Sequence, residues 1–175
     1  MQLREYTASD ELAKIKGLYE AAFPAVERKP FSLMRAALGK GVEMLGIEAD
    51  GRFVGLAIML LSDTVALLDY FAVLPDCRGG GIGSAALALL RARYPERPLL
   101  VEIEDPDALS DNPAERLRRK AFYLRNGMRE MPYRVLFYGT EMQVLTLGGT
   151  VTPDRHLAVY RTVLGEETAK HICPL

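Results

Sequence analysis

The hydrophobic and polar positions of the chain switch several times between a helical spacing and a strand-like spacing. Between residues 9 and 23, apolar side chains recur every three or four positions, which predicts an amphipathic helix with Ser9 or Asp10 as its N-cap. Three apolar runs then lie between residues 42 and 74, and the Asp50–Gly51 pair is typical of a tight turn between antiparallel strands. This half of the chain therefore predicts helices followed by an antiparallel meander.

The second half alternates helices and strands more evenly. A glycine-rich segment at 79–83 precedes a leucine- and alanine-rich helix, and an apolar strand follows at 98–104. A helix is expected over 114–127, then a hairpin over 133–148, and a last helix that starts at Thr152–Pro153. The predicted order is β α α β β β α β α β β α. It corresponds to an α/β fold with a mixed, mostly antiparallel central sheet flanked by helices.

Length and composition indicate one globular domain over residues 1–175, with 150–175 as a C-terminal helical extension. The 22 basic and 23 acidic side chains leave a formal charge of -1, so we expect neither a nucleic-acid nor a membrane partner. The N-terminus lacks a signal-peptide pattern and no apolar run reaches about 18 residues, which predicts a cytoplasmic protein. Cys77 and Cys173 have no nearby Cys or His in sequence, so no metal site is expected.

The strongest chemical signal is the loop "CRGGGIGS", which has four glycines in five positions, 79–83. Glycine permits positive φ angles and lets the backbone approach a ligand closely. The helix that follows offers unpaired N–H groups and the positive end of its dipole, so a phosphate or pyrophosphate is the expected guest. Arg78 is expected either to contact that anion or to brace the loop.

Two other phosphate-binding motifs also contain glycine loops of this kind. A P-loop requires a lysine directly after its last glycine, and none is present here. A dinucleotide motif fits better, because "GIGSAA" starts at Gly81 and Glu102 follows about 20 residues later. Against it, "LPDCR" separates the strand from the glycines, and too little chain follows to build further βαβ units.

The segment "VLPDCRGGGIGSAAL" resembles the acetyl-coenzyme A loop of the GCN5-related N-acetyltransferase (GNAT) family. Arg78, Gly81 and Gly83 match the family's signature of Gln or Arg, two residues, Gly, one residue, and Gly or Ala. Farther along, "AFYLRNGM" is similar to the family's helix that ends in tyrosine, three residues and glycine, with Tyr123 at the position of the catalytic acid. The order of elements agrees with the family over about residues 1–147.

The resemblance implies an N-acetyltransferase that uses acetyl-CoA as donor, in which a primary amine attacks directly in a ternary complex. Tyr123 would then protonate the departing thiolate, because a phenol stays protonated at neutral pH. Glu102 or Asp69 would act as the base, unless either forms a structural pair with Arg119 or another arginine. The implied cofactor contacts are Phe71, Ala72, Val73, Arg78, Gly79, Gly80, Gly81, Ile82, Gly83 and Ser84.

The amine acceptor is not identified by the sequence. In this family the segment between the first two helices borders the acceptor site, and here it supplies Glu27 to attract an ammonium group and Phe31 to pack against its carbon chain. The family's asparagine seven residues before the tyrosine is replaced by Arg116, with Asn112 one helical turn earlier. The apolar residues of 150–175 predict docking on the sheet or on a second copy of the chain. Two alternatives stay open: an acyl-CoA sensor without efficient transfer, and an NAD-type enzyme.

Overall fold

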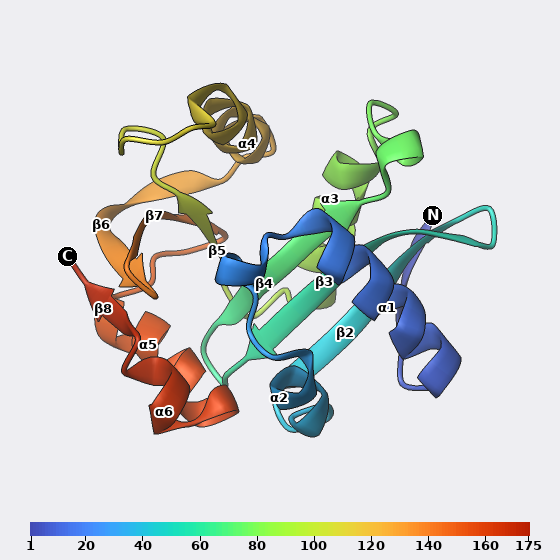
Figure 1. Ribbon diagram of the computed structural model, residues 1–175, viewed down its shortest axis with the longest axis horizontal. Helices are drawn as coiled ribbons and strands as arrows, with labels where there is room; N and C mark the ends of the chain where they lie inside the picture. The colour runs from blue at the N-terminus through green and yellow to red at the C-terminus, as the bar shows by residue number, and fades with distance from the viewer.

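The computed structural model describes residues 1–175, and its centre is one eight-stranded sheet in the order β1-β2-β3-β4-β5-β7-β6-β8 (Figure 1). The strands are β1 (Gln2–Glu5), β2 (Val42–Ala49), β3 (Arg52–Leu61), β4 (Ala66–Val73), β5 (Leu99–Glu104), β6 (Arg129–Phe137), β7 (Thr140–Leu147) and β8 (Ile172–Pro174). The helices are α1 (Ser9–Ala22), α2 (Phe31–Ala36), α3 (Ile82–Arg93), α4 (Pro113–Arg125), α5 (Pro153–Leu164) and α6 (Glu166–Ala169), with 3₁₀ turns η1 (Ala25–Glu27) and η2 (Pro75–Cys77). All strand pairs are antiparallel except β4 with β5, which confirms the predicted fold class.

Helices cover both faces of the sheet and create two separate cores. On one face α1, α2 and α5 bury side chains such as Ile15, Met34 and Tyr160 against the strands. On the other face α3 and α4 contribute side chains such as Leu87 and Tyr123. Alternate residues of each strand point to opposite faces, so one strand feeds both cores. No helix combines the length and the apolarity that crossing a membrane requires.

The parallel pair of β4 and β5 separates halfway along its length. Only Ala66–Leu68 of β4 pair with Leu99–Val101 of β5, although both strands continue beyond this ladder. At the same point β4 carries an extra residue: Ile58 of β3 faces Tyr70, Met59 faces Leu68, and Asp69 between them has no partner. Such a bulge bends a strand and re-aims its side chains. The sheet therefore opens from Asp69 on β4 and Glu102 on β5 onward.

The N-terminus of α1 differs from the predicted cap. Helix α1 begins at Ser9 with Ala8 as its N-cap, so the prediction of Ser9 or Asp10 as cap is wrong by one or two positions. The free N–H groups of Thr7 and Ala8 instead donate to the carboxylate of Glu11 at 3.2 Å each. A carboxylate in the first turn also interacts favourably with the helix dipole.

Residues 150–175 fold back onto the same chain. Thr152 caps α5 as predicted, and its hydroxyl accepts from the N–H of Arg155 at 3.4 Å. After α6 the chain adds strand β8, which sequence reasoning missed, and β8 pairs with Val135–Phe137 of β6. The extension thus completes one edge of the sheet as well as covering one face, and the C-terminus lies beside β8 in Figure 1.

If β8 is an integral part of this core, truncating its one buried side chain should destabilise the protein. Ile172 is buried, whereas its neighbour Cys173 is exposed on the same strand. We expect Ile172→Ala to lower the free energy of unfolding in urea by about 2–5 kcal/mol. The matched control Cys173→Ala should change it by less than about 0.5 kcal/mol. Equal small effects from both variants would contradict the docking of β8.

Candidate active site

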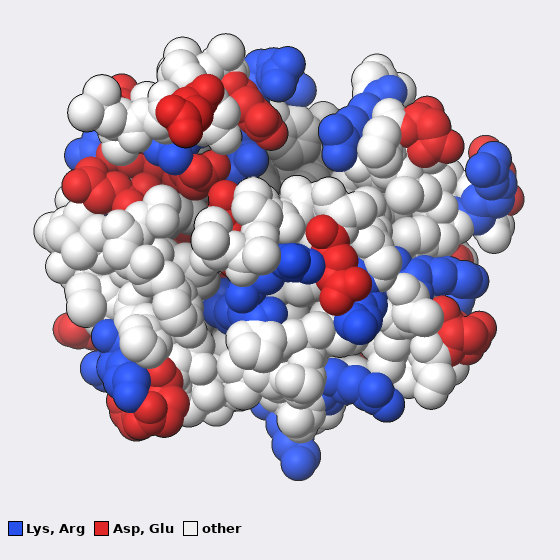
Figure 2. All heavy atoms as spheres, in the orientation of Figure 1, with Lys and Arg blue, Asp and Glu red and all other residues white.

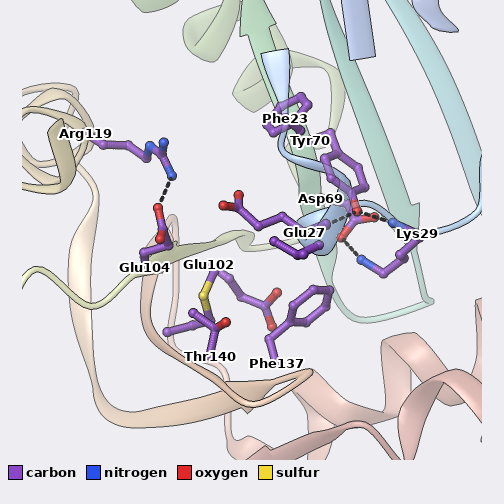
Figure 3. A pocket seen from close by; sticks show the side chains of 12 residues that line it. Phe23, Glu27, Lys29, Asp69, Tyr70, Glu102, Glu104, Arg119, Phe137 and Thr140 are labelled. Atoms are coloured by element: carbon purple, nitrogen blue, oxygen red, sulfur yellow. Dashed lines mark hydrogen bonds and ion pairs between the residues drawn. The ribbon is translucent and has the colours of Figure 1, made fainter. Parts of the chain in front are cut away.

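Two cavities on opposite faces of the sheet meet where β4 and β5 separate. The cavity on the α1 side measures about 80 Å³ and is shown in Figure 3. The cavity on the α4 side measures about 240 Å³. Four residues line both: Phe23, Asp69, Glu102 and Arg119. The opening of the sheet therefore forms a passage between the two faces, with two carboxylates at its centre.

The glycine loop lies at one end of the larger cavity and is built for close approach of a ligand. Gly79 and Gly81 have φ angles of +84° and +79°, which side chains other than glycine rarely adopt. Added Cβ atoms at Gly79, Gly80 and Gly81 would meet nothing within 4 Å, so the space beside this backbone is open. Gly81 is the left-handed N-cap of α3, and the first N–H groups of that helix follow it. This geometry suits an anion, as predicted.

Arg78 braces the loop in the structure. Its Nε donates to the carbonyl of Val73, the last residue of β4, at 3.0 Å. Gly83 has a packing role of its own, because a Cβ there would lie 3.2 Å from the ring of Phe122 on α4. Ile82 and Ser84 form the first turn of α3. The loop is thus held between the end of β4 and the two helices on this face.

The free edge of β4 faces the larger cavity. Leu74 donates its N–H to Val54 of β3 at 2.9 Å, and backbone groups alternate along a strand. The backbone groups of Phe71 and Val73 therefore point away from β3, toward the opening, while those of Ala72 point toward β3. Of the three residues predicted to pair with the cofactor through their backbone, Ala72 is thus not at the open edge, although it lines the cavity.

Asp69 forms a buried ion pair that the sequence did not indicate. Lys29 Nζ lies 2.7 Å from Asp69 Oδ1, and both side chains are at most 2% exposed. The ammonium also faces the rings of Phe137 at 4.3 Å and Tyr70 at 5.0 Å, which favours a cation in this position. Burial raises the pKa of Asp69, although Lys29 acts in the opposite direction. The structural partner of Asp69 is therefore Lys29, and not Arg119 or another arginine.

Glu102 is held by two residues of the C-terminal extension. Tyr160 donates its hydroxyl to Glu102 Oε2 at 2.6 Å. His156 Nε2 lies 2.7 Å from Oε1, an ion-pair distance at an angle that departs from an aligned hydrogen bond. Burial acts to raise the pKa of Glu102, but the nearby His156, Tyr160 and Lys29 together hold it below its usual range. Glu102 is therefore a carboxylate at neutral pH.

Glu104, which also lines the smaller cavity, is neutralised by α4. Arg116 donates to it at 2.5 Å and Arg119 at 3.3 Å. Arg116 also donates to the carbonyl of Asp105 at 3.0 Å and to Asn112 Oδ1 at 3.1 Å. The residue at the position of the family's asparagine is thus engaged in fixing α4 to β5.

Tyr123 lies on the opposite face from these carboxylates and lines the larger cavity. Burial raises the pKa of its phenol to about 12, with Arg119 acting weakly against this shift. The hydroxyl is therefore protonated at neutral pH, as a general acid must be. The arrangement separates proton acceptors on the α1 side from a proton donor on the α4 side.

The two residues predicted for the acceptor lie in different places. Glu27 lines the smaller cavity and its carboxylate points into it, without an ion pair, as Figure 3 shows. Burial raises its pKa, with the charge of Glu104 as a second cause. Phe31 instead packs against Tyr19, with ring centroids 5.8 Å apart, and does not line this cavity. Of the two predicted acceptor residues, only Glu27 thus lines this cavity, and the aromatic ring of Phe23 lies beside it.

Charge around the site is unevenly distributed. The smaller cavity is lined by four carboxylates, on Glu27, Asp69, Glu102 and Glu104, against two cations, on Lys29 and Arg119. Figure 2 shows acidic side chains gathered below α4 and a hollow in the surface between α4 and α3. Aromatic walls with an excess of carboxylates favour a positively charged guest.

Comparison with known families matches residues 12–127, two thirds of the chain, to the Acetyltransferase (GNAT) family. The chain belongs to this family. No curated protein matches it. Among solved structures, a GNAT-family acetyltransferase from Bacteroides thetaiotaomicron is 21% identical, with a TM-score of 0.79, and the match covers 94% of this chain and 99% of that one.

Two further solved structures share the GNAT fold. The ribosomal-protein-S18-alanine N-acetyltransferase from Escherichia coli is 18% identical, has a TM-score of 0.63, and is matched over 87% of this chain and 97% of its own. A GNAT-family acetyltransferase from Elizabethkingia anophelis, solved with acetyl-CoA bound, is 16% identical with a TM-score of 0.60, over 83% and 96% of the two chains.

The buried pair of Lys29 and Asp69 predicts a specific pH dependence of stability. Lys29→Met leaves a buried carboxylate without its cation and should lower the free energy of unfolding by about 3–5 kcal/mol at pH 7. Because burial already raises the pKa of Asp69 and loss of Lys29 would raise it further, protonation should relieve this destabilisation as the pH falls from 7 toward 4.

Urea unfolding at several pH values measures this effect. The control Lys16→Met removes an exposed lysine of α1 and should change stability by less than about 0.5 kcal/mol at every pH. A deficit in Lys29→Met that does not shrink at acid pH would contradict the assignment of a buried, charged pair.

Proposed function

We propose that this protein transfers the acetyl group of acetyl-CoA to a primary amine, by direct attack in a ternary complex. The observation that carries the proposal is the passage between the two faces of the sheet. A donor on the α4 side and an acceptor on the α1 side would meet there, between carboxylates on one face and Tyr123 on the other. Holding two substrates face to face in this way removes much of the entropic barrier to their reaction.

The larger cavity and the glycine loop suit the donor. The N–H groups of residues 79–84 and the N-terminus of α3 would bind the pyrophosphate. The pantetheine arm would pair like an added strand with the backbone of Phe71 and the N–H of Val73, whose carbonyl already accepts from Arg78. The E. anophelis structure with acetyl-CoA bound supports this donor. The thioester would then point toward the opening between Asp69 and Glu102.

The reaction requires proton transfers at the nitrogen and at the sulfur. An alkylammonium, with a pKa of about 10.4, must lose one proton to the base before its nitrogen attacks the thioester carbon. The C–N bond forms, the C–S bond breaks, and the departing thiolate takes the phenolic proton of Tyr123. The pKa of about 12 for Tyr123 keeps this proton in place until charge develops on the sulfur. The nitrogen releases its second proton as the amide forms, and this proton restores the phenol.

Glu102 fits the role of base better than Asp69. Protonation of Asp69 would leave the ammonium of Lys29 buried without a counter-ion, and a lysine gives up its proton with difficulty. Glu102 instead forms no ion pair with a lysine or an arginine: the Tyr160 hydroxyl donates to it, and it faces the imidazole of His156. A proton can therefore arrive at Glu102 without leaving a buried lysine or arginine unpaired.

The acceptor amine would enter through the smaller cavity. Glu27 is the carboxylate there that has no cationic partner, and Phe23 and Phe137 supply apolar surface beside it. This combination favours an ammonium on a short carbon chain or at the end of a peptide. The E. coli structure, named for an alanine of a ribosomal protein, gives a peptide amine as one such acceptor class.

The proposal is tested by thiol release from acetyl-CoA with a panel of amines, which includes diamines, amino sugars and peptides with different N-termini. Thiol release with at least one amine, and the acetylated product by mass spectrometry, would support it. Stabilisation by acetyl-CoA with no turnover across the panel would favour an acyl-CoA sensor instead. Stabilisation by NAD but not by acetyl-CoA would favour the dinucleotide enzyme.

The loop predicts a variant that impairs donor binding and leaves the fold intact. Gly80 has an ordinary φ angle and open space beside it, so Gly80→Val should fold normally while its side chain fills the expected pyrophosphate site. We expect the Kd for acetyl-CoA, measured by calorimetry, to rise at least about tenfold. The matched control is Gly17→Val, at an equally open glycine of α1. The same Kd in both variants would move the donor away from this loop.

Tyr123→Phe should remove the acid while keeping the ring. Loss of a general acid lowers turnover by about 10²–10⁴, and we expect about a hundredfold loss of kcat with the Kd for acetyl-CoA nearly unchanged. The control Tyr94→Phe removes a hydroxyl that hydrogen-bonds to Glu43 at 2.8 Å, away from the opening, and should keep full turnover. If kcat of Tyr123→Phe stays within about threefold of wild type, another group protonates the thiolate.

A further inference from the structure

His156 lies between Glu102, at the centre of the site, and Tyr133 on β6. The side chain is fully buried, on α5, and its two ring nitrogens face different partners. Nε2 lies 2.7 Å from Glu102 Oε1, and Nδ1 lies 3.4 Å from the hydroxyl of Tyr133 on β6. A buried imidazole between a carboxylate and a phenol is a group that can hold or release a proton in place.

Tyr133 both contacts this imidazole and lines the surface. Its side chain is half-buried and lines a surface depression of about 390 Å³ together with Arg134 and Gln143. The β6–β7 ladder is interrupted here, because Glu130 pairs with Leu145 and the next pair is Arg134 with Gln143. Tyr133 is thus one residue of a bulge that lies between His156 and this depression.

The other titratable and charged groups near this imidazole come from α5 itself, from the segment before α2 and from β4. Tyr160, one turn along α5, donates to the second oxygen of Glu102 and has its ring centroid 6.0 Å from that of His156. Lys29 and Asp69 form their own pair beyond Tyr160. Because that pair is internally neutral, the protonation of His156 is the change of charge that Glu102 experiences most directly.

We propose that His156 is a positioning residue that sets the proton affinity of Glu102 and exchanges its own proton with solvent through Tyr133. The inference rests on the proposed function, in which Glu102 is the base. As an imidazolium, His156 stabilises the carboxylate of Glu102 and makes it a weak base. When the Nδ1 proton passes to the Tyr133 hydroxyl, whose own proton passes to water in the depression, the imidazole becomes neutral. Glu102 then becomes a stronger base, still held by the hydroxyl of Tyr160.

This role differs from that of a merely structural histidine in its effect on pH dependence. The depressed pKa of Glu102, which His156 helps to cause, supports the coupling. Rate should increase as His156 loses its proton, and the midpoint of this increase should equal the pKa of His156 itself. A histidine that only anchors the extension would affect the rate by the same factor at every pH.

The coupling is measured directly by NMR titration of the histidines, without any need for turnover. The chain has two histidines, and the exposed His171, stacked on Tyr138, serves as an internal reference. Glu102→Gln removes the carboxylate that stabilises the imidazolium, so the pKa of His156 should fall by about one unit or more while that of His171 stays constant. An unchanged pKa of His156 would overturn the proposal.

Kinetics then tests the consequence with the best amine acceptor. His156→Gln keeps an N–H donor toward Glu102 but carries no charge, so the inflection at the pKa of His156 should vanish from the pH profile of kcat/KM. A profile that keeps this inflection and is lowered uniformly would overturn the proposal. If wild type acetylates no amine, the proposed function itself is wrong, and the NMR titration still decides whether Glu102 and His156 are coupled.

Tyr133→Phe provides a second variant in case the buried substitution at His156 prevents folding. It should keep the inflection, because the imidazole remains, and lower kcat by about tenfold with an unchanged KM for acetyl-CoA, because proton exchange with solvent is slowed. The matched control is Tyr138→Phe, at an exposed tyrosine of the β6–β7 turn, with wild-type kinetics expected. Equal kcat values in the two variants would remove Tyr133 from the route.

Discussion

The separation of β4 from β5 is the constraint on which the rest of the structure depends. Three paired residues hold the two strands together, and the bulge at Asp69 then turns β4 away. Each strand beyond that point has a free edge, and a buried free edge is unfavourable unless something occupies it or water reaches it. The opening is stable because helices α1 and α4 border it and because polar side chains line it. A cavity through the centre of a sheet is thus built into the strand pairing.

The carboxylates at this opening are tolerated because each receives its cation or donors from a different part of the chain. Asp69 is paired with Lys29, from the segment after α1, and Glu104 with arginines of α4. Glu102 is held by α5. A buried charge without such a partner costs several kcal/mol, so the site assembles only when all three segments are in place. Glu27 is the exception, because its carboxylate faces the cavity without a cationic partner.

The sequence predicted the fold, and it singled out part of the candidate site, for physical reasons. The glycine loop, Tyr123 and the acids on alternate strand residues are local patterns, and a pattern of spacing is visible in one segment. No local spacing pattern marks Lys29, Tyr160 or His156. Their contacts at the site join residues that lie 40 to 58 positions apart in the sequence. Lys29 lies in the polar stretch "ERKP", which by itself indicates an exposed loop. The position of Phe31 outside the cavity has the same cause, because only the packing decides which ring faces the opening.

The C-terminal extension both completes the sheet and contacts Glu102 at the candidate site. The family match ends at residue 127, yet Tyr160 and His156 beyond it hold the carboxylate at the centre of the site. Asp69 forms a direct ion pair with Lys29, whereas Glu102 is held by a tyrosine hydroxyl and faces an imidazole. The partner of Asp69 lies within the family match, and both partners of Glu102 lie beyond it. The anchoring of α5 and the environment of Glu102 therefore depend on the same two side chains.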